Sequence, residues 1–281
     1  MTLLRGGMIG ENIGNSRFAR AFEIMCTDHG LRLEFSPIDT KGLEAFDFVE
    51  TVDQLRQDGW TAVTVTHPWK PDAASYAGDT MGAGVAALGA ANILSFKGGL
   101  AGHNTDYHGF LGAWRAGMGD AAPGRVAMAG AGGVARALGP ALARLGAEEI
   151  AIWDPSPGLA ETLAGIIGPS ARVIALEEAP EVIAQADGLV NATPLGMAGY
   201  GGTAFAPEYV GGQSWAFDAV YTPTDTEFLR TAGAKDLEVL TGFDLFRHMA
   251  LASFEAYSGI APDAGTTLPK LGALRPREES A

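Results

Sequence analysis

Cysteine, basic side chains and long apolar runs are all scarce in this chain. Its single cysteine, Cys26, excludes an internal disulfide framework and a metal site built from several cysteines, and we expect it to be a small buried helix residue. The segment from Met1 to Asn12 lacks the apolar run of a signal peptide or a membrane anchor. These absences favour a cytoplasmic protein that makes no membrane contact.

Charge and composition exclude further classes. The chain has 33 acidic and 19 basic residues, a formal net charge of −14, and no basic cluster, so a nucleic-acid partner is not expected. The 47% of hydrophobic and 19% of charged residues are typical of a compact folded protein. The histidines lack a metal-ligand spacing with carboxylates nearby, and no metal is predicted.

Short apolar runs alternate with amphipathic stretches, which is typical of an α/β fold built on a mainly parallel sheet. Strands are expected at residues 3–9, 31–37, 62–66, 91–96, 126–129, 149–153, 172–174, 188–191, 214–218 and 238–240. The Gly, Pro and Asp residues of 118–125 indicate a new domain, entered along a helix that begins near Asp106. A helix over 243–257 is expected to return to the first domain.

The strongest physical signal is RVAMAGAGGVARALGPALARLG, residues 125–146, in which an apolar strand leads into a glycine turn and a small-residue helix. Glycines let the backbone approach a pyrophosphate, and the helix N-terminus offers free N–H groups. A second strand follows and ends at Asp154, about 20 residues beyond the turn. This order predicts a dinucleotide site whose turn consists of Gly130, Ala131, Gly132, Gly133 and Val134.

Asp154 indicates which dinucleotide is preferred. Its carboxylate can accept hydrogen bonds from both ribose hydroxyls and would repel a 2′-phosphate, and the next three residues supply no arginine to bind one. NAD is therefore predicted as the preferred cofactor over NADP. The alternative is that Asp154 caps the next helix and that the glycines only make a tight turn.

Residues 188–197 predict a strand that ends in polar residues, at the carboxyl edge where open sheets bind ligands. Asn191 and Thr193 are expected beside the nicotinamide half of the cofactor. A plain strand followed by an Asn/Pro turn explains the same residues equally well.

In the first half, polar residues gather at the ends of predicted strands and helices: Thr64, Thr66, Lys70, Asn92, Asn104, Thr105 and Asp106. A lysine and an aspartate that meet in space can move a proton to or from a carbinol oxygen. The residues alone are also explained by Lys70 as a solvated helix-start charge and Asp106 as a helix N-cap.

An ordered set of motifs resembles the shikimate/quinate dehydrogenase family along almost the whole chain except the tail: MIGENIGNS (8–16), VTVTHPWK (63–70), ALGAANIL (87–94), GHNTDYHGF (102–110), GAGGVARA (130–137), LVNATPLGM (189–197) and DAVYTPTDTEFL (218–229). The resemblance implies two α/β domains: a substrate-binding catalytic domain, 1–105 completed by 243–281, and a Rossmann-type, doubly wound NAD(P)-binding domain, 106–242. It implies an NAD(P)-dependent oxidoreductase, a monomer or a homodimer, that interconverts a ring hydroxyl and a ketone of a cyclic small molecule.

The same resemblance implies roles for single residues. Lys70 and Asp106 correspond to the catalytic lysine and aspartate, with Lys70 taking the hydroxyl proton while the hydride passes to NAD. The substrate positions are Ser16, Phe18, Thr64, Thr66, Asn92, Tyr221 and Met249. The cofactor positions are the glycine turn with Asp154, Asn191, Thr193, Met197, Val220 and Gly242.

Several substrate positions depart from the family pattern. Phe18 replaces a hydroxyl that binds the substrate carboxylate, Thr64 an asparagine, Ile93 a threonine, and Met249 the glutamine that binds a ring hydroxyl, while Ala19 replaces a proline. Because each change removes or shrinks a polar group or adds apolar bulk, a less polar or differently substituted ring alcohol or ketone is expected in place of shikimate. Alternatively, the alignment shifts by a residue or two, and Arg17 or Arg20 contacts a carboxylate.

Two further interpretations keep a similar two-domain plan. A metabolite sensor that binds NAD without turnover has no need of Lys70 and Asp106, so their presence speaks against it. A methylenetetrahydrofolate-type dehydrogenase would also have a lysine near its site, but it explains the GHNTD motif poorly.

Overall fold

The computed structural model describes residues 2–43 and 45–276, which form two compact units. The first unit comprises the described residues up to Gly109 together with Arg247–Leu274, and the second comprises Phe110–Phe246 together with the last described residues. Both boundaries fall inside helices, α4 (Thr105–Met118) and α9 (Gly242–Ser258), a few residues after the expected positions 105/106 and 242/243. Since a continuous helix carries no turn residues at such a boundary, the sequence does not mark it.

The first unit is built on a mixed sheet with the strand order β2-β1-β3-β4-β5. β1 pairs in parallel with β2 and β3, whereas β3, β4 and β5 pair in antiparallel fashion. The strands are β1 (Leu3–Gly10), β2 (Arg32–Asp39), β3 (Ala62–Val65), β4 (Ile93–Ser95) and β5 (Ala101–His103). The expectation of a mainly parallel sheet therefore holds for only part of this unit.

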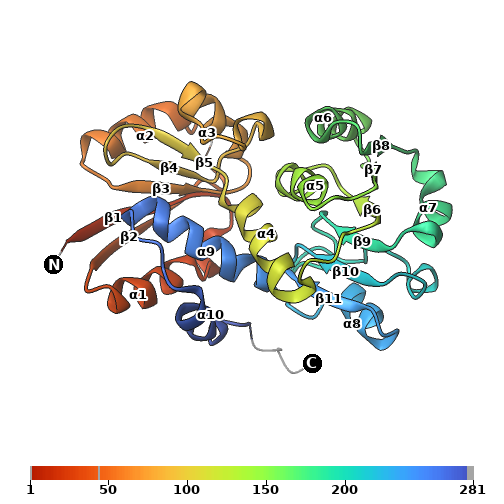
Figure 1. Ribbon diagram of the computed structural model, residues 1–281. Coiled ribbons are helices and arrows are strands. Elements are labelled where there is room, and N and C mark those ends of the chain that lie inside the picture. Colours follow the sequence, from red (N-terminus) through yellow and green to blue (C-terminus); the bar gives the residue numbers. More distant parts are fainter. Residues whose placement is uncertain (1, 44, 277–281) are drawn as a thin grey trace. The chain divides into compact units, whose positions relative to one another are not determined.

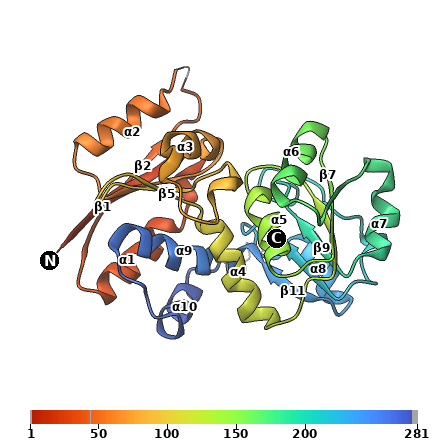
Figure 2. The same cartoon turned by 45° about the horizontal axis from the view of Figure 1, so that its top comes forward.

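Helices cover both faces of this sheet (Figures 1 and 2). α2 (Phe48–Gln57) and α3 (Lys70–Ala77) lie on one face, and their buried side chains share a core with Ile9, Val63 and Leu94. α1 (Phe18–Asp28), α9 and α10 (Ala264–Gly272) lie on the other. There, aromatic rings form the core: Phe18, Phe22, Phe35, Phe254 and Tyr257.

The second unit has a wholly parallel sheet in the order β11-β10-β9-β6-β7-β8. Its strands are β6 (Arg125–Ala129), β7 (Glu149–Trp153), β8 (Ala171–Val173), β9 (Gly188–Asn191), β10 (Trp215–Asp218) and β11 (Glu238–Thr241). This is the doubly wound order, with the direction of winding reversed between β6 and β9. The predicted Rossmann-type domain is confirmed.

The helices of this unit also cover both faces of its sheet. α5 (Ala135–Arg144) and α6 (Pro157–Ile167) lie together on one face (Figure 1), whereas α7 (Ala179–Gln185) and α8 (Glu227–Ala234) share a core on the other with Ala127, Leu189 and Ala216. Short 3₁₀ helices lie at Ile13–Asn15, Gly78–Thr80, Ala86–Leu88, Leu176–Glu178 and Pro207–Tyr209.

The expected strands are all present, with ends that differ by a few residues, but β5 was not predicted. β5 has three residues, Ala-Gly-His, with no β-branched side chain to mark it. Its glycine is required by packing, because a Cβ on Gly102 would lie 2.4 Å from the Met81 sulfur and 2.5 Å from the Ala77 Cβ. β4 is shorter than expected, so Asn92 precedes the strand rather than lying within it.

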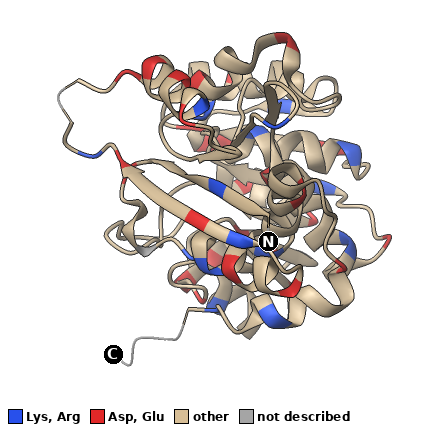
Figure 3. Cartoon of the chain, turned by 90° about the vertical axis from the view of Figure 1, so that its left-hand side faces the viewer, with Lys and Arg blue, Asp and Glu red and all other residues tan. Residues whose placement is uncertain are grey.

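The edge strand β2 carries basic and acidic residues (Figure 3): Arg32 of β2 and Arg5 of the neighbouring β1 each lie 3.8 Å from the carboxylate of Glu34. Cys26 is a buried residue of α1, as expected, and burial raises the pKa of its thiol to about 11. Within the described residues, no helix is both long and apolar enough to cross a bilayer.

Candidate active site

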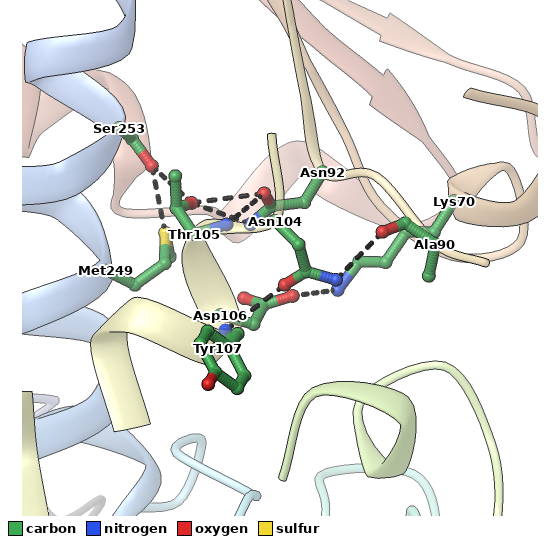
Figure 4. A network of polar contacts seen from close by, with 9 residues as sticks. All are labelled: Lys70, Ala90, Asn92, Asn104, Thr105, Asp106, Tyr107, Met249 and Ser253. Carbon is green, nitrogen blue, oxygen red and sulfur yellow. Dashed lines mark hydrogen bonds and ion pairs between the residues drawn. The ribbon is translucent and has the colours of Figure 1, made fainter. Parts of the chain in front are cut away.

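The first unit brings Lys70 and Asp106 together. Lys70 is the first residue of α3 and Asp106 lies in the first turn of α4. The Nζ of Lys70 is 2.6 Å from the Oδ2 of Asp106, with the side chains 15% and 9% exposed, and the two point toward each other in Figure 4. A close, partly buried pair of this kind keeps enough access to bind a ligand and exchange a proton with it.

The helix that carries Asp106 is anchored at its start by two asparagines. Asn104 accepts a hydrogen bond from the backbone N–H of Tyr107 at 3.1 Å and donates to the carbonyl of Ala90 at 2.9 Å, so Asn104 caps α4 and Asp106 does not. The Oδ1 of Asn92 accepts from the backbone N–H of Thr105 at 2.7 Å. These bonds fix the backbone on both sides of Asp106 and leave its carboxylate for Lys70.

A chain of hydroxyl contacts continues from Thr105 to α9 (Figure 4). The Oγ1 of Thr105 lies 2.8 Å from the Oγ of Ser253, which in turn donates to the sulfur of Met249 at 3.3 Å. α9 packs tightly against α4 here, because a Cβ on Gly109 would lie 2.7 Å from the Cβ of Met249. The sulfur of Met249, a predicted substrate contact, is therefore already engaged inside the protein.

Thr64 is also engaged. It is 4% exposed, and its Oγ1 lies 2.9 Å from the phenol oxygen of Tyr257. The hydroxyl of Tyr257 donates its proton to the carbonyl of Gly7 at 3.1 Å. Thr64 is therefore the donor in the hydrogen bond between the two hydroxyls. Burial raises the pKa of Tyr257, which remains a neutral phenol. Thr64 thus has no hydroxyl proton to offer a ligand.

The remaining substrate positions of the first unit differ in access. Ser16 is half-buried, and its Oγ accepts from the backbone N–H of Phe18 at 3.3 Å, at the start of α1. Phe18 itself is 1% exposed and stacks on Phe22 with 4.6 Å between ring centroids. Thr66 is half-buried, with its methyl group against Gly10. Phe18 therefore lies in the core, where it adds no exposed apolar surface.

In the second unit, the glycine turn follows β6 at the point where the winding of the sheet reverses. Gly130 has φ +94°, and a Cβ there would lie 2.9 Å from the carbonyl carbon of Ala192, so only glycine fits. Nothing lies within 4 Å of a Cβ built on Gly132, which leaves its backbone open to a ligand. Val134 is the N-cap of α5, and the N–H groups of residues 136 and 137 already bond to the carbonyls of Gly132 and Val134, so the helix offers a ligand the positive end of its dipole.

Asp154 follows β7 and lies against the same turn. Its Oδ2 accepts from the backbone N–H of Ala131 at 2.9 Å, and its Oδ1 accepts from that of Ser156 at 2.8 Å. The N-cap of α6 is Ser156, so Asp154 is not the cap residue of that helix. A carboxylate thus lies beside the glycine turn.

Asn191 is the last residue of β9 and pairs in register with Ala129. Its Oδ1 accepts from the backbone N–H and the hydroxyl of Thr193 at 2.9 and 2.7 Å, and its Nδ2 donates to the carbonyl of Leu195 at 3.0 Å. The asparagine thus shapes the loop after β9, on which Met197 is 37% exposed.

The loop after β10 completes this edge. Val220 is 5% exposed, and Tyr221 stacks on Phe246 with 5.6 Å between ring centroids. Gly242, the first residue of α9, must be glycine because a Cβ would lie 2.4 Å from the carbonyl oxygen of Ala219. The predicted cofactor positions therefore all lie at or next to the carboxyl ends of β6, β7, β9, β10 and β11.

Sequence reasoning did not assign several side chains that organise these groups: Ser253, Tyr257, Asp218 and Thr226. No local pattern distinguishes them from neighbouring residues, and their roles follow from partners that the fold brings together. Among the described residues, no group of three His, Cys, Asp or Glu side chains is placed to hold a metal ion.

No model of a known protein family matches the chain. The quinate/shikimate dehydrogenase (NAD(+)) of Corynebacterium efficiens is 34% identical over 266 residues, covering 92% of this chain and 93% of that protein. The shikimate dehydrogenase (NADP(+)) of Streptomyces avermitilis is 34% identical over 278 residues, covering 95% and 94%.

Solved structures are similar over the same extent. The quinate dehydrogenase from Corynebacterium glutamicum in complex with NAD has a TM-score of 0.89 at 29% identity, covering 97% of this chain and 100% of that one. The shikimate 5-dehydrogenase from Thermus thermophilus in complex with NADP(H) and shikimate has a TM-score of 0.82 at 31% identity, covering 96% and 99%.

Proposed function

The chain belongs to the shikimate/quinate dehydrogenase family of NAD(P)-dependent oxidoreductases, as its motifs predict, and on this premise we propose that it interconverts a ring hydroxyl and a ketone of a cyclic, shikimate- or quinate-like substrate. The observation that carries the proposal is the pair of Lys70 and Asp106, 2.6 Å apart and anchored by the asparagines at the start of α4. A protein that only sensed a metabolite would not need a proton-transfer pair.

Each member of the pair has a distinct part in the proposed reaction. In the oxidation direction, neutral Lys70 accepts the proton of the substrate hydroxyl at Nζ. Asp106 stabilises the ammonium group that results and keeps Nζ oriented, which lowers the entropy that must be lost to reach the reactive geometry. The reverse transfer from Lys70 protonates the carbonyl oxygen in reduction.

The second unit fits a nicotinamide dinucleotide. The space beside Gly132 is open, the positive end of the α5 dipole follows the glycine turn, and Asp154 lies beside the turn, an arrangement that suits a pyrophosphate and its ribose. NAD(P), when bound, would accept or supply the hydride. We propose NAD as the preferred form, because the carboxylate of Asp154 would repel a 2′-phosphate and residues 155–157 contain no arginine.

Substrate preference is proposed to differ from that of a shikimate enzyme. Thr64 gives its proton to Tyr257, and Met249 takes the place of an amide and is bonded to Ser253. Ring hydroxyls would find no hydrogen-bond donor at either position, which lowers affinity for highly hydroxylated rings. Phe18 and Ile93 are 1% and 0% exposed, so the proposal rests on lost polar groups rather than on added apolar bulk.

The first experiment follows NADH and NADPH formation by the purified protein with shikimate, quinate and a panel of cyclohexanols. We expect NAD-linked turnover that favours less hydroxylated rings. Efficient turnover of shikimate with NAD would contradict the altered preference while leaving the enzyme class intact. Cofactor binding without turnover of any ring alcohol would instead favour the metabolite sensor.

Variants separate the roles of the named residues. Lys70→Ala should bind NADH normally and lose nearly all turnover, because the proton acceptor is gone, and general acid–base catalysis contributes roughly 10²- to 10⁴-fold. Lys41→Ala is the matched control, because that lysine is exposed and bonded to Asn12. Met249→Gln should raise kcat/KM for shikimate relative to a cyclohexanol, and no change in that ratio would remove Met249 from the specificity argument.

A further inference from the structure

A buried carboxylate at the carboxyl edge of the second sheet belongs to none of the groups assigned so far. Asp218 is the last residue of β10, is 0% exposed, and pairs in register with Asn191 of β9. Its Oδ1 accepts from the Nδ2 of Asn191 and from the backbone N–H of Val220, both at 2.9 Å. Its Oδ2 accepts from the hydroxyl of Thr226 at 2.6 Å.

These donors belong to separate segments of the edge. Asn191 holds the loop after β9 through Thr193, Val220 begins the loop after β10, and Thr226 caps α8 by accepting from Leu229. The two loops also meet through a backbone bond from Ala198 to Thr222 at 3.1 Å. One side chain thus joins the loop after β9 to the loop after β10.

Burial of this carboxylate destabilises the folded state, because the charged group loses its hydration. Desolvation raises the pKa of Asp218 to about 6, although Thr226, Val220 and Asn191 all donate to it and act in the opposite direction. An apolar or neutral side chain of similar size would avoid the cost of desolvation. The side chain does, however, supply two oxygens that accept from three donors, which an apolar group of that size cannot do.

We propose that Asp218 is a positioning residue that holds the loops after β9 and β10 in the geometry that binds the nicotinamide end of NAD(P). The inference rests on the proposed dinucleotide site, because Asn191, Thr193 and Val220 are among its predicted contacts. Asp218 acts through these residues and does not touch the cofactor.

The test compares Asp218→Ala with Asp218→Asn in the full chain, using the fluorescence of NADH to measure its Kd and steady-state kinetics for the ring substrate. Asparagine keeps an acceptor for Asn191 and Val220 and can donate to Thr226, whereas alanine abolishes all three contacts. We expect Asp218→Ala to weaken NADH binding at least about tenfold, since three hydrogen bonds to the two loops are lost together. Asp218→Asn should stay within about threefold of the parent protein.

Asp187→Ala is the matched control. Asp187 lies at the amino end of the same sheet, where its carboxylate accepts from the backbone N–H of Arg125 at 2.7 Å. Its removal should change stability without changing the Kd for NADH. The KM for the ring substrate at saturating NAD should change less than the Kd for NADH in Asp218→Ala, which distinguishes loop positioning from general loosening of the fold.

The outcomes are separable from the proposed function. If the parent protein does not bind NADH, the dinucleotide site itself fails, whatever Asp218 does. If the parent protein binds and Asp218→Ala binds equally well, or if asparagine fails to restore binding, the positioning role is overturned. Should Asp218→Ala not fold, Thr226→Val and Thr226→Ser carry the test: weakened NADH binding in the valine variant alone supports the role, and equal binding in both refutes it.

Discussion

The free energy of unfolding of Asp218→Asn, relative to that of the parent protein, should increase as the pH rises from acid to alkaline values. The folded protein raises the pKa of Asp218 from 3.8 to about 6, so the folded state holds this proton more tightly than the unfolded state does. The stabilisation from proton binding is complete below pH 3.8 and is lost as the pH rises through 6. Asparagine does not titrate, so the variant avoids this loss.

The magnitude follows from the two pKa values. The difference between 3.8 and about 6 corresponds to roughly 3 kcal/mol over the full range, of which about 2 kcal/mol falls between pH 4.5 and pH 8. Any change in hydrogen bonding to Thr226 adds the same amount to the variant's free energy of unfolding at every pH, because Thr226 does not titrate. The pH dependence of the difference therefore isolates the buried charge.

The assay is urea unfolding of both proteins at constant ionic strength and without cofactor, followed by tryptophan fluorescence. The free energy of unfolding of Asp218→Asn minus that of the parent protein should rise by about 2 kcal/mol from pH 4.5 to pH 8. Asp187→Asn, which changes an exposed carboxylate, serves as the control. A difference that is flat or falls with pH would refute the assignment of a buried, largely unionised Asp218 below pH 6.

Further changes test other parts of the structure. Phe18→Ala should destabilise the protein by about 3–5 kcal/mol through the cavity it leaves among the aromatic rings, measured by urea unfolding, whereas a loss below 1 kcal/mol would place this ring outside the core. Gly242→Ala should lower the melting temperature, because its Cβ would lie 2.4 Å from the carbonyl oxygen of Ala219, and an unchanged melting temperature would contradict this packing. Thr105→Val should reduce kcat by about tenfold, because the hydroxyl links Asn92 to Ser253 beside Asp106. Thr105→Ser, which keeps the hydroxyl, should have a kcat close to that of the parent protein. Equal kcat values for the two variants would show that the link has no catalytic effect.

Local patterns accounted for the elements of the fold. Alternation of apolar runs with amphipathic stretches located the strands of both sheets except β5, because a buried parallel strand needs a continuous apolar run. β5 is not predicted, because three residues with a central glycine show no alternation of apolar and polar side chains. The boundaries of the units were displaced because both lie within continuous helices.

The predicted dinucleotide site is the part of the proposed function that local sequence patterns indicate most directly. Its turn, helix and acid are local in the chain, and steric limits on a pyrophosphate-binding loop demand glycine at fixed spacing. The structure adds that Asp154 bonds to Ala131, across 23 residues of chain. That contact depends on β6 and β7 being neighbours in the sheet.

The sequence by itself determined the α/β class, the family and the identity of the candidate pair, because motif order and residue type are properties of the chain. Only the tertiary structure decided that Lys70 reaches Asp106, that Phe18 is buried in the core, and that Asp218 joins two loops. Hydrogen bonds and ion pairs act over about 3 Å, and residues far apart in the chain come within that range only when strands and helices pack.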